Sequence, residues 1–193
     1  MRIVAGHLKG RRLEAPIGRD LRPTSDRARE GLFNRLDHGG FGPGGASILA
    51  SATVLDAFCG TGALGLEALS RGAASVTFLD ADRNALNAAR ANAKRLEVEA
   101  RCRFVQADAA FPPRARQAHD LILMDPPYAS DLAGQALTAL ARHGWIDPGA
   151  IAAIETDARG KAPAAPPGFE LLAEARYGAA RMSILRDTAR AED

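Results

Sequence analysis

The sequence predicts an α/β fold with a mostly parallel sheet, and three observations lead to it. Short apolar strand-like segments alternate with helix-like segments from residue 53 onward, a pattern typical of a parallel sheet covered on both faces. The last two strand-like segments, 169–177 and 180–187, are joined so tightly at Gly178 that they must pair antiparallel. With 47% hydrophobic and 25% charged residues, the composition is that of an ordinary globular protein.

The elements follow in order along the chain. Two short extended segments surround His7–Gly10, and a loop and a helix come next. The apolar positions of that helix recur at helical spacing: Ala28, Leu32, Phe33 and Leu36. Beyond it we expect strands at 53–58, 75–80, 101–107, 119–125 and 150–156, and helices at 62–71, 82–97 and 131–143.

Charge and glycine content divide the chain into parts. Residues 1–36 hold nine basic and four acidic side chains, a net charge of +5, while the remaining 16 basic and 19 acidic residues give −3. A basic front indicates a polyanionic partner, although an arginine-rich composition could also scatter such residues without a role. We therefore expect a basic extension of a hairpin and a helix at 1–37, a glycine-rich connection at 38–52 and the α/β domain at 53–193.

Neither cysteine nor histidine usage predicts a metal site. Cys59 and Cys102 are far apart and the four histidines form no cluster, so no ligand spacing typical of zinc is present. No apolar run approaches the roughly 18 residues of a membrane span. A reduced, cytoplasmic setting without a stable protein partner is the simplest interpretation.

Aspartates mark the ends of four successive predicted strands. They are Asp56, Asp80, Asp108 and Asp125. Because the carboxyl ends of parallel strands meet at one edge, where such sheets bind ligands, these side chains are expected to lie close together. One aspartate at a strand end is a common turn residue, but four on one edge predict a site.

A glycine-rich loop joins the first predicted strand to its helix. The segment DAFCGTGALG contains Gly60, Gly62 and Gly65, and Asp80 follows 20 residues after Gly60. This spacing matches the dinucleotide-binding fingerprint and would by itself suggest NAD. The bland alternative is a strand-to-helix turn that binds nothing.

The carboxylate that precedes the glycines favours a different ligand. Asp56 would be poorly placed beside a pyrophosphate, since both are anions, but well placed for a ligand with an ammonium group, such as S-adenosylmethionine. In this interpretation the Gly60–Gly62 turn lets the backbone approach the ligand closely. Asp80 then accepts from the ribose hydroxyls and Asp108 from the adenine amino group.

The fourth predicted strand ends in Asp125-Pro126-Pro127-Tyr128, which a strand interior could not contain. A carboxylate and a fixed backbone carbonyl can accept from the two N–H bonds of a planar amine and stabilise the positive charge that grows on it during methylation. Tyr128 offers a flat face for an unstacked base. The structural alternative is a rigid turn, and the motif fits planar amines in general.

The motifs LDAFCGTGALGLEALSRGA and LMDPPY resemble those of class I S-adenosylmethionine-dependent amino-methyltransferases. The N-terminal stretch RIVAGHLKGRRLEAP…LRPTSDRAREGLFN narrows the resemblance to the bacterial 16S rRNA guanine-N2 methyltransferases of the RsmD family. That resemblance covers nearly the whole chain. It implies a Rossmann-like, seven-stranded sheet with an antiparallel last strand, and methyl transfer to the N2 amine of a guanine in the 16S rRNA of the small (30S) ribosomal subunit.

The resemblance also assigns roles by motif. The cofactor-binding positions are Asp56, Phe58, Gly60, Thr61 and Gly62 in the loop, Asp80 and Ala81 toward the ribose, and Asp108 and Ala109 toward the adenine. The residues that hold the target base are Asp125, Pro126, Pro127 and Tyr128. The residues that contact rRNA phosphates are Lys9, Arg11, Arg12, Arg22, Arg27 and Arg29, and such contacts weaken steeply with salt.

Three departures from the family pattern and three alternatives accompany these assignments. Cys59 stands where Ala is frequent, Asp80 where Glu is common, and the glycine-rich segment 38–47 is longer than usual. Another planar amine, such as adenine N6 or a protein glutamine, would suit the same motif. An NAD-linked oxidoreductase explains the glycine loop but not Asp56 or Asp125, and a non-catalytic RNA-binding module explains only the basic front.

Overall fold

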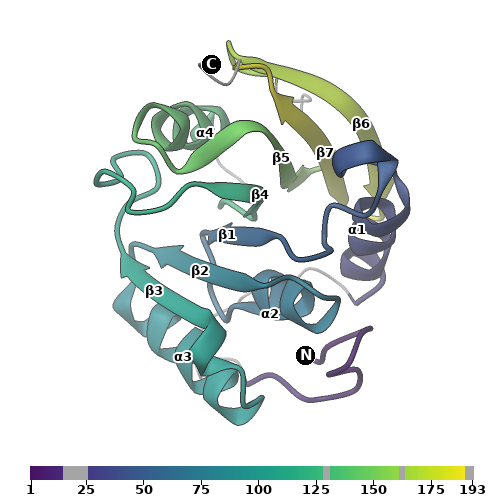
Figure 1. Ribbon diagram of the computed structural model, residues 1–193, viewed down its shortest axis with the longest axis vertical. Helices are drawn as coiled ribbons and strands as arrows, with labels where there is room; N and C mark the ends of the chain where they lie inside the picture. The colour runs from purple at the N-terminus through teal and green to yellow at the C-terminus, as the bar shows by residue number, and fades with distance from the viewer. Residues whose placement is uncertain (15–25, 128–130, 161–163, 190–193) are drawn as a thin grey trace.

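A seven-stranded sheet forms the centre of the computed structural model, which describes residues 1–14, 26–127, 131–160 and 164–189 (Figure 1). The strands lie in the order β3-β2-β1-β4-β5-β7-β6. Their bounds are β1 Thr53–Ala57, β2 Ser75–Asp80, β3 Cys102–Gln106, β4 His119–Met124, β5 Ile146–Asp157, β6 Phe169–Tyr177 and β7 Ala180–Asp187. The first five strands are parallel, and β7 runs antiparallel to both of its neighbours. The predicted sheet is therefore confirmed.

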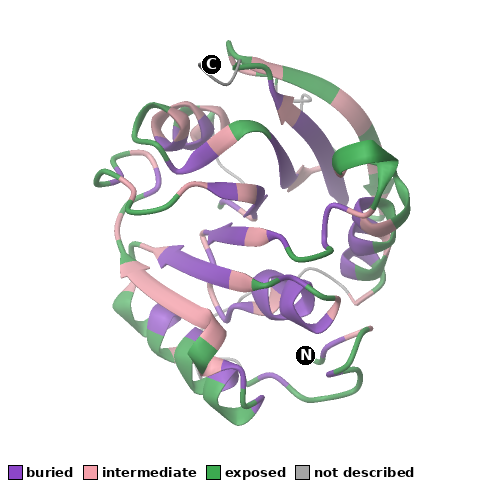
Figure 2. Cartoon of the chain, in the orientation of Figure 1, coloured by how far each residue is buried: buried purple, intermediate pink, exposed green. Residues whose placement is uncertain are grey.

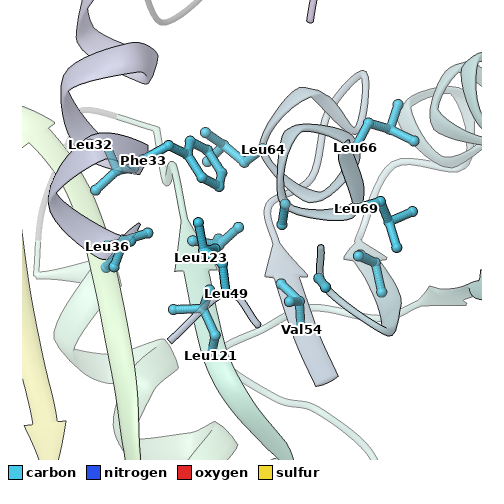
Figure 3. Close-up of a cluster of buried hydrophobic side chains, with 14 of the residues drawn as sticks. Leu32, Phe33, Leu36, Leu49, Val54, Leu64, Leu66, Leu69, Leu121 and Leu123 are labelled. Carbon is cyan, nitrogen blue, oxygen red and sulfur yellow. The ribbon is translucent and has the colours of Figure 1, made fainter. Parts of the chain in front are cut away.

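The two faces of the sheet are covered differently. Helices α1 (Asp26–His38), α2 (Ala63–Ser70) and α3 (Arg83–Arg95) pack on one face, and α4 (Leu132–Arg142) packs on the other. Apolar residues alternate along β4, so that Leu121 and Leu123 face the three-helix layer while Ile122 and Met124 face α4. Figure 3 shows the leucines of α1, α2 and β4 gathered in the three-helix layer.

Exposure follows the same layering. Figure 2 shows the central strands buried, whereas α3 carries a buried stripe and an exposed outer surface. Among the described residues, no helix is long and apolar enough to cross a membrane.

The N-terminal segment lies against α2 rather than apart from the domain. Its two extended pieces meet at the bridge between Arg2 and Arg12, where the N–H groups of Ile3 and Leu13 donate to the carbonyls of Arg11 and Met1. Ile3, Leu8 and Leu13 are buried in the same apolar cluster as α1 and α2. The segment and the sheet thus share one interior.

One strand is longer than the sequence predicts. We expect a strand at 150–156, yet β5 begins at Ile146, which pairs with His119 of β4. The register shifts before the regular pairing of Leu121 with Ile151. The intervening Asp147, Pro148 and Gly149 are poor strand formers, so the early start depends on its neighbour and carries no local signal.

Candidate active site

Strand register brings the predicted site residues to one edge of the sheet. Ala57, the last residue of β1, pairs with Leu79 of β2 and with Met124 of β4. The residues that follow are therefore level with one another: Phe58, Asp80 and Asp125. The glycine loop and the Asp-Pro-Pro motif leave neighbouring strands side by side, as the sequence predicts.

Asp56 is a buried carboxylate with little compensation. Its side chain is 1% exposed, and Oδ2 accepts a hydrogen bond of 2.8 Å from the Gly65 N–H. Burial raises the pKa of Asp56 well above its ordinary value, the Gly65 bond opposes that rise, and the nearby charges of Asp125 and Asp80 add to it. Three carboxylates converge here, which is an environment that stabilises a cation.

The glycine loop bends through left-handed backbone conformations. Gly60 and Gly62 have φ of +53° and +78°, and Phe58 adopts φ +62° although it has a side chain, a conformation that is strained for a bulky residue. A Cβ on Gly60 would meet no described atom within 4 Å, so that side of the loop is open. A Cβ on Gly65 would meet the Phe78 ring at 2.6 Å, so Gly65 allows close packing of helix on strand.

Asp80 fixes the loop from the neighbouring strand. Its Oδ2 accepts from the Gly60 N–H at 3.0 Å and its Oδ1 accepts from the Asp82 N–H at 2.9 Å. Asp108 lies two residues beyond β3, is exposed, and accepts from the Ala110 N–H at 2.8 Å. Both aspartates therefore lie at the carboxyl edge in oriented positions.

The remaining cofactor-site predictions divide by burial. Thr61 and Ala109 are buried and Ala81 is exposed. Cys59 is also buried, and burial, with Asp56 and Asp80 nearby, raises the pKa of its thiol. A thiol held neutral in this way is suited to packing.

The Asp-Pro-Pro motif follows β4 directly. Asp125 is half-buried, Pro126 is buried and Pro127 is exposed. Tyr128 lies outside the described residues. A hollow of about 970 Å³, lined in part by Pro126 and Pro127, opens beside the motif.

Most of the predicted phosphate-binding side chains are exposed. They are Lys9, Arg11, Arg12 and Arg27, whereas Arg22 lies outside the described residues. The prediction for Arg29 is wrong, because its side chain is 0% exposed. Arg29 Nη2 donates to Asp26 Oδ1 at 2.8 Å and to the Arg2 carbonyl at 2.6 Å, and Nε lies 3.9 Å from Glu67 Oε2. This guanidinium holds the interior together and cannot reach a phosphate.

Two buried polar residues near the site were not predicted. The Asn92 amide of α3 exchanges two hydrogen bonds with the Glu14 backbone and donates to the Thr61 carbonyl, which ties the N-terminal segment to the glycine loop. Glu67 of α2 accepts from the N–H groups of Val4 and Ala5. The available signal for Glu67 was a charge in the apolar helix α2, and for Asn92 it was the helical spacing that it shares with the buried Ala85 and Ala89 of α3.

Comparison with known proteins decides the family. A family model described as "Conserved hypothetical protein 95" matches residues 1–186. The chain is 33% identical over 193 residues to the ribosomal RNA small subunit methyltransferase D of Escherichia coli K12, covering 100% of this chain and 92% of that protein. The chain belongs to the RsmD family of methyltransferases. The resemblance inferred from the sequence motifs is therefore confirmed.

Further relatives agree with this membership. The protein of the same name from Haemophilus influenzae is 34% identical over 186 residues, covering 92% of this chain and 89% of that one. The solved structure of yhhF from Escherichia coli, named as a methyltransferase, is similar at a TM-score of 0.82 and 32% identity, over 98% of this chain and 99% of that chain. The Rossmann-like class I fold expected from the sequence is thereby confirmed.

The RsmD family and its fold imply S-adenosylmethionine as the methyl donor, and the residues present fit that group. The buried Asp56, with Asp80 and Asp125 close by, favours a ligand that carries positive charge. The open side of Gly60 leaves room for close approach. The same carboxylates would repel a pyrophosphate, which argues against a nicotinamide dinucleotide.

Proposed function

We propose that this protein transfers a methyl group from S-adenosylmethionine to the exocyclic N2 amine of one guanine in 16S rRNA of the small ribosomal subunit. The single observation that carries the proposal is the register that sets Asp125 beside the glycine loop, at the level of Phe58 and Asp80. The names of the relatives, which are small-subunit rRNA methyltransferases, support RNA as the substrate. A ribosomal substrate would also place the reaction in the cytoplasm.

Asp125 and Pro126 would act on the target amine. The lone pair of the exocyclic amine is delocalised into the ring of the base, so the amine must be oriented before it can act as a nucleophile. The Asp125 carboxylate and the Pro126 carbonyl accept from its two N–H bonds and stabilise the charge that develops on nitrogen. Proline at 126 and 127 removes competing N–H donors and restricts the backbone around that carbonyl.

The loop after β1 would hold the methyl donor. When bound, S-adenosylmethionine supplies an electrophilic methyl group on a positively charged sulfur. Asp56 attracts the amine of its methionyl part, Asp80 accepts from the ribose hydroxyls, and Asp108 accepts from the adenine amino group. The motif assigns four further residues to the binding site of the methyl donor: Thr61, Gly62, Ala81 and Ala109. Tyr128 would provide a stacking face for the target base.

The exposed basic residues of the N-terminal segment would contact RNA phosphates. Lys9, Arg11 and Arg12 lie in a short stretch held against α2, and Arg27 lies on the exposed face of α1. The Arg11 Nη2 donates to the carbonyl of Arg95 at 2.7 Å, so this arginine has a defined position on the surface. Such contacts supply affinity without reading the sequence.

The test is methylation of a defined ribosomal substrate. Small subunits, or 16S rRNA, from cells lacking the gene are incubated with methyl-labelled S-adenosylmethionine, and the labelled nucleoside is identified. We expect N2-methylguanosine. Labelled N6-methyladenosine or labelled protein would redirect the proposal to another planar amine. Tight binding of NAD without any response to S-adenosylmethionine in calorimetry would end it.

The Asp125→Ala variant assigns the chemistry. Removing one preorganised acceptor should lower the methylation rate by about 100- to 1,000-fold. Binding of S-adenosylmethionine and of RNA, measured by calorimetry and filter binding, should stay within about threefold of the parent, because Asp125 acts on the amine. Unchanged turnover would contradict the role given to Asp125.

A further inference from the structure

The hollow beside Pro126 and Pro127 extends well beyond the Asp-Pro-Pro motif. Its other walls come from the segment after β3 at Ala110 and Phe111, the helix α4, the end of β5, and Gly160, Ala164 and Pro166 beyond that strand. Along α4 it reaches Arg142 and His143 at the far end of the helix. We call this hollow the α4 groove. It begins where the target base is proposed to be held and leads away from it.

Phe111 is an unusual wall for this groove. Its side chain is 83% exposed. In the described part of the chain, only three large apolar residues are exposed, and Phe111 is the most exposed of them. Its N–H donates to the Asp108 carbonyl at 3.0 Å, so the ring projects from a turn at the carboxyl edge of the sheet. A single exposed apolar side chain needs no explanation, but this one lines a groove that adjoins the reacting position.

The segment that carries Phe111 is held firmly in place. Pro112 is buried, the Trp145 Nε1–H donates to the Pro113 carbonyl at 2.8 Å, and the Ala115 N–H donates to the His143 carbonyl at 2.9 Å. Figure 1 shows this segment, between β3 and β4, beside α4. The ring therefore sits on a fixed support and not on a free loop.

Positive charge accompanies the aromatic ring. Arg114 and Arg116 are exposed on the same segment, outside the lining of the groove. The hydrogen bond from the Ala115 N–H to the His143 carbonyl brings the backbone of this segment to the end of α4, where the exposed Arg142 lines the groove. Residues 109–119 contain no acidic side chain. The carboxylates that line the groove are Asp131, which precedes α4, and Asp157, at the end of β5. Asp131 and Arg142 thus lie at opposite ends of α4, and Asp157 comes from β5.

We propose that the α4 groove binds the single-stranded RNA next to the target nucleotide, with an unpaired base stacked on Phe111 and phosphates against Arg114, Arg116 and Arg142. The inference rests on the proposed function and adds a second RNA contact to it. Turning one base out of its stack leaves the neighbouring base without a partner. An aromatic ring beside the reacting position replaces that lost contact, and arginines balance the backbone charge.

This contact is separate from the basic N-terminal segment. Ile3 and Leu8 of that segment belong to the apolar layer of α1, α2 and α3, whereas Ala109 and Ala133 beside the groove belong to the layer of α4. The two surfaces lie on opposite faces of the sheet. RNA would therefore be held from both sides of the catalytic edge, and each contact can be removed without the other.

A tryptophan introduced in the α4 groove would report RNA binding through its fluorescence. The chain has one tryptophan, Trp145, which is 2% exposed. In a Phe111→Trp variant the new indole would dominate the solvent-accessible emission, and a base stacked on it should quench that emission as RNA is added. The kcat and KM of this variant are measured beside those of the parent, so that quenching is compared with RNA that the variant turns over. An emission unaffected by RNA that the variant binds and methylates would overturn the inference.

Truncations measure the energetic contribution. Loss of one stacked base corresponds to an RNA affinity loss of about 5- to 150-fold, so Phe111→Ala should raise KM for the RNA substrate within that range and leave the Kd for S-adenosylmethionine unchanged. The matched control is Leu171→Ala, which truncates a 49% exposed side chain on β6. A combined Arg114→Ala and Arg116→Ala variant should lower the salt slope of RNA binding, whereas Arg176→Ala on β6 should not.

The outcomes separate this inference from the proposed function. If the parent methylates rRNA and the groove variants match Leu171→Ala and Arg176→Ala in affinity and turnover, the groove inference fails and the proposed function stands. If the parent methylates no RNA, the proposed function fails first. Quenching of the Phe111→Trp emission by a protein or by duplex RNA in preference to single-stranded RNA would also overturn the inference.

Discussion

Two fully buried carboxylates lie close along the chain and are treated in opposite ways. Asp56 is 1% exposed and Glu67 is 0% exposed. Glu67 pairs with Arg71 at 2.8 Å and with Arg29 at 3.9 Å, and it accepts from the N–H groups of Val4 and Ala5. Asp56 accepts one bond from Gly65 and is further destabilised by the nearby charges of two other carboxylates.

The difference teaches how to tell a structural charge from a binding charge. A buried carboxylate surrounded by cations and N–H donors is fully compensated by the fold itself. A buried carboxylate that meets one donor and two like charges is compensated only when a cation arrives. Glu67 therefore organises the N-terminal segment, whereas Asp56 is arranged for a ligand.

The largest expected effect comes from neutralising Glu67. A Glu67→Gln variant removes the carboxylate that pairs with the buried Arg71 at 2.8 Å, while Arg29 keeps its pair with Asp26. Breaking a buried pair in this way costs about 3–5 kcal/mol. The melting temperature should fall by about 10 °C. Glu170→Gln on the exposed face of β6 is the control and should change stability by less than about 0.5 kcal/mol. Equal melting temperatures for the two variants would break the comparison.

The opposite sign is expected for Asp56. An Asp56→Asn variant keeps an acceptor for Gly65 and removes the uncompensated charge, so the ligand-free protein should become more stable by about 1–4 kcal/mol. Its affinity for S-adenosylmethionine should fall by about 30-fold or more, because the ligand loses a buried counter-ion. Thermal unfolding and calorimetry measure the two quantities. A variant that is less stable than the parent would place Asp56 in the same class as Glu67.

The pH dependence sharpens this contrast. Because the folded protein raises the pKa of Asp56, the parent loses stability as the pH rises from the unfolded pKa of about 3.9 toward the folded value. Asp56→Asn avoids that loss, so the stability difference between variant and parent should grow as the pH rises above about 4. A difference that shrinks with rising pH would contradict the direction of the shift.

Comparing the Asp56→Asn variant with the parent cancels the effect of a second titrating group, His119. Burial lowers the pKa of His119, which hydrogen-bonds to the Trp145 carbonyl and to Thr77 Oγ1. The folded state therefore favours the neutral ring, and its contribution is lost as the pH falls below the unfolded pKa of about 6.5. Parent and variant share this loss, so it cancels in their difference.

The smallest effect concerns the surface that Glu67 supports. Replacing Arg11 and Arg12 by Ala should reduce the slope of log K for RNA against log salt by about 1–2, since each lost phosphate contact releases about 0.7–0.9 fewer counter-ions. The folded protein should keep its melting temperature, because both side chains are exposed. A slope equal to that of the parent would show that these arginines do not contact RNA.

Local patterns predicted what depends on near neighbours. A continuous apolar run at 121–124 defined β4. The aspartates at strand ends indicated a common edge, which the register of Ala57 with Leu79 and Met124 confirms. Pairing partners far along the chain were not accessible. The early start of β5 at Ile146 depends on His119, 27 positions before it, and no local rule favours a strand through a proline.

Arg29 illustrates a signal that was present and overlooked. It shares the helical spacing of Leu32, Phe33 and Leu36, which are buried on α1, so periodicity alone places it on the apolar face. Its charge suggested a surface role. Its counter-ions are Asp26, three positions before it, and Glu67, 38 positions further along the chain. Sequence patterns do not connect Arg29 with Glu67. No sequence motif indicated the roles that we propose for the residues of the α4 groove.

The docking of the N-terminal segment has a consequence for how the chain is made. Val4 is held by Glu67, Glu14 by Asn92 and Arg11 by the carbonyl of Arg95, across separations of 63, 78 and 84 positions. At about 5–20 residues per second, a ribosome needs about 4–17 s to synthesise the chain from Arg11 to Arg95. The N-terminal segment is thus placed only after α2 and α3 have been synthesised. A stalled chain would carry the arginines but not the surface they form.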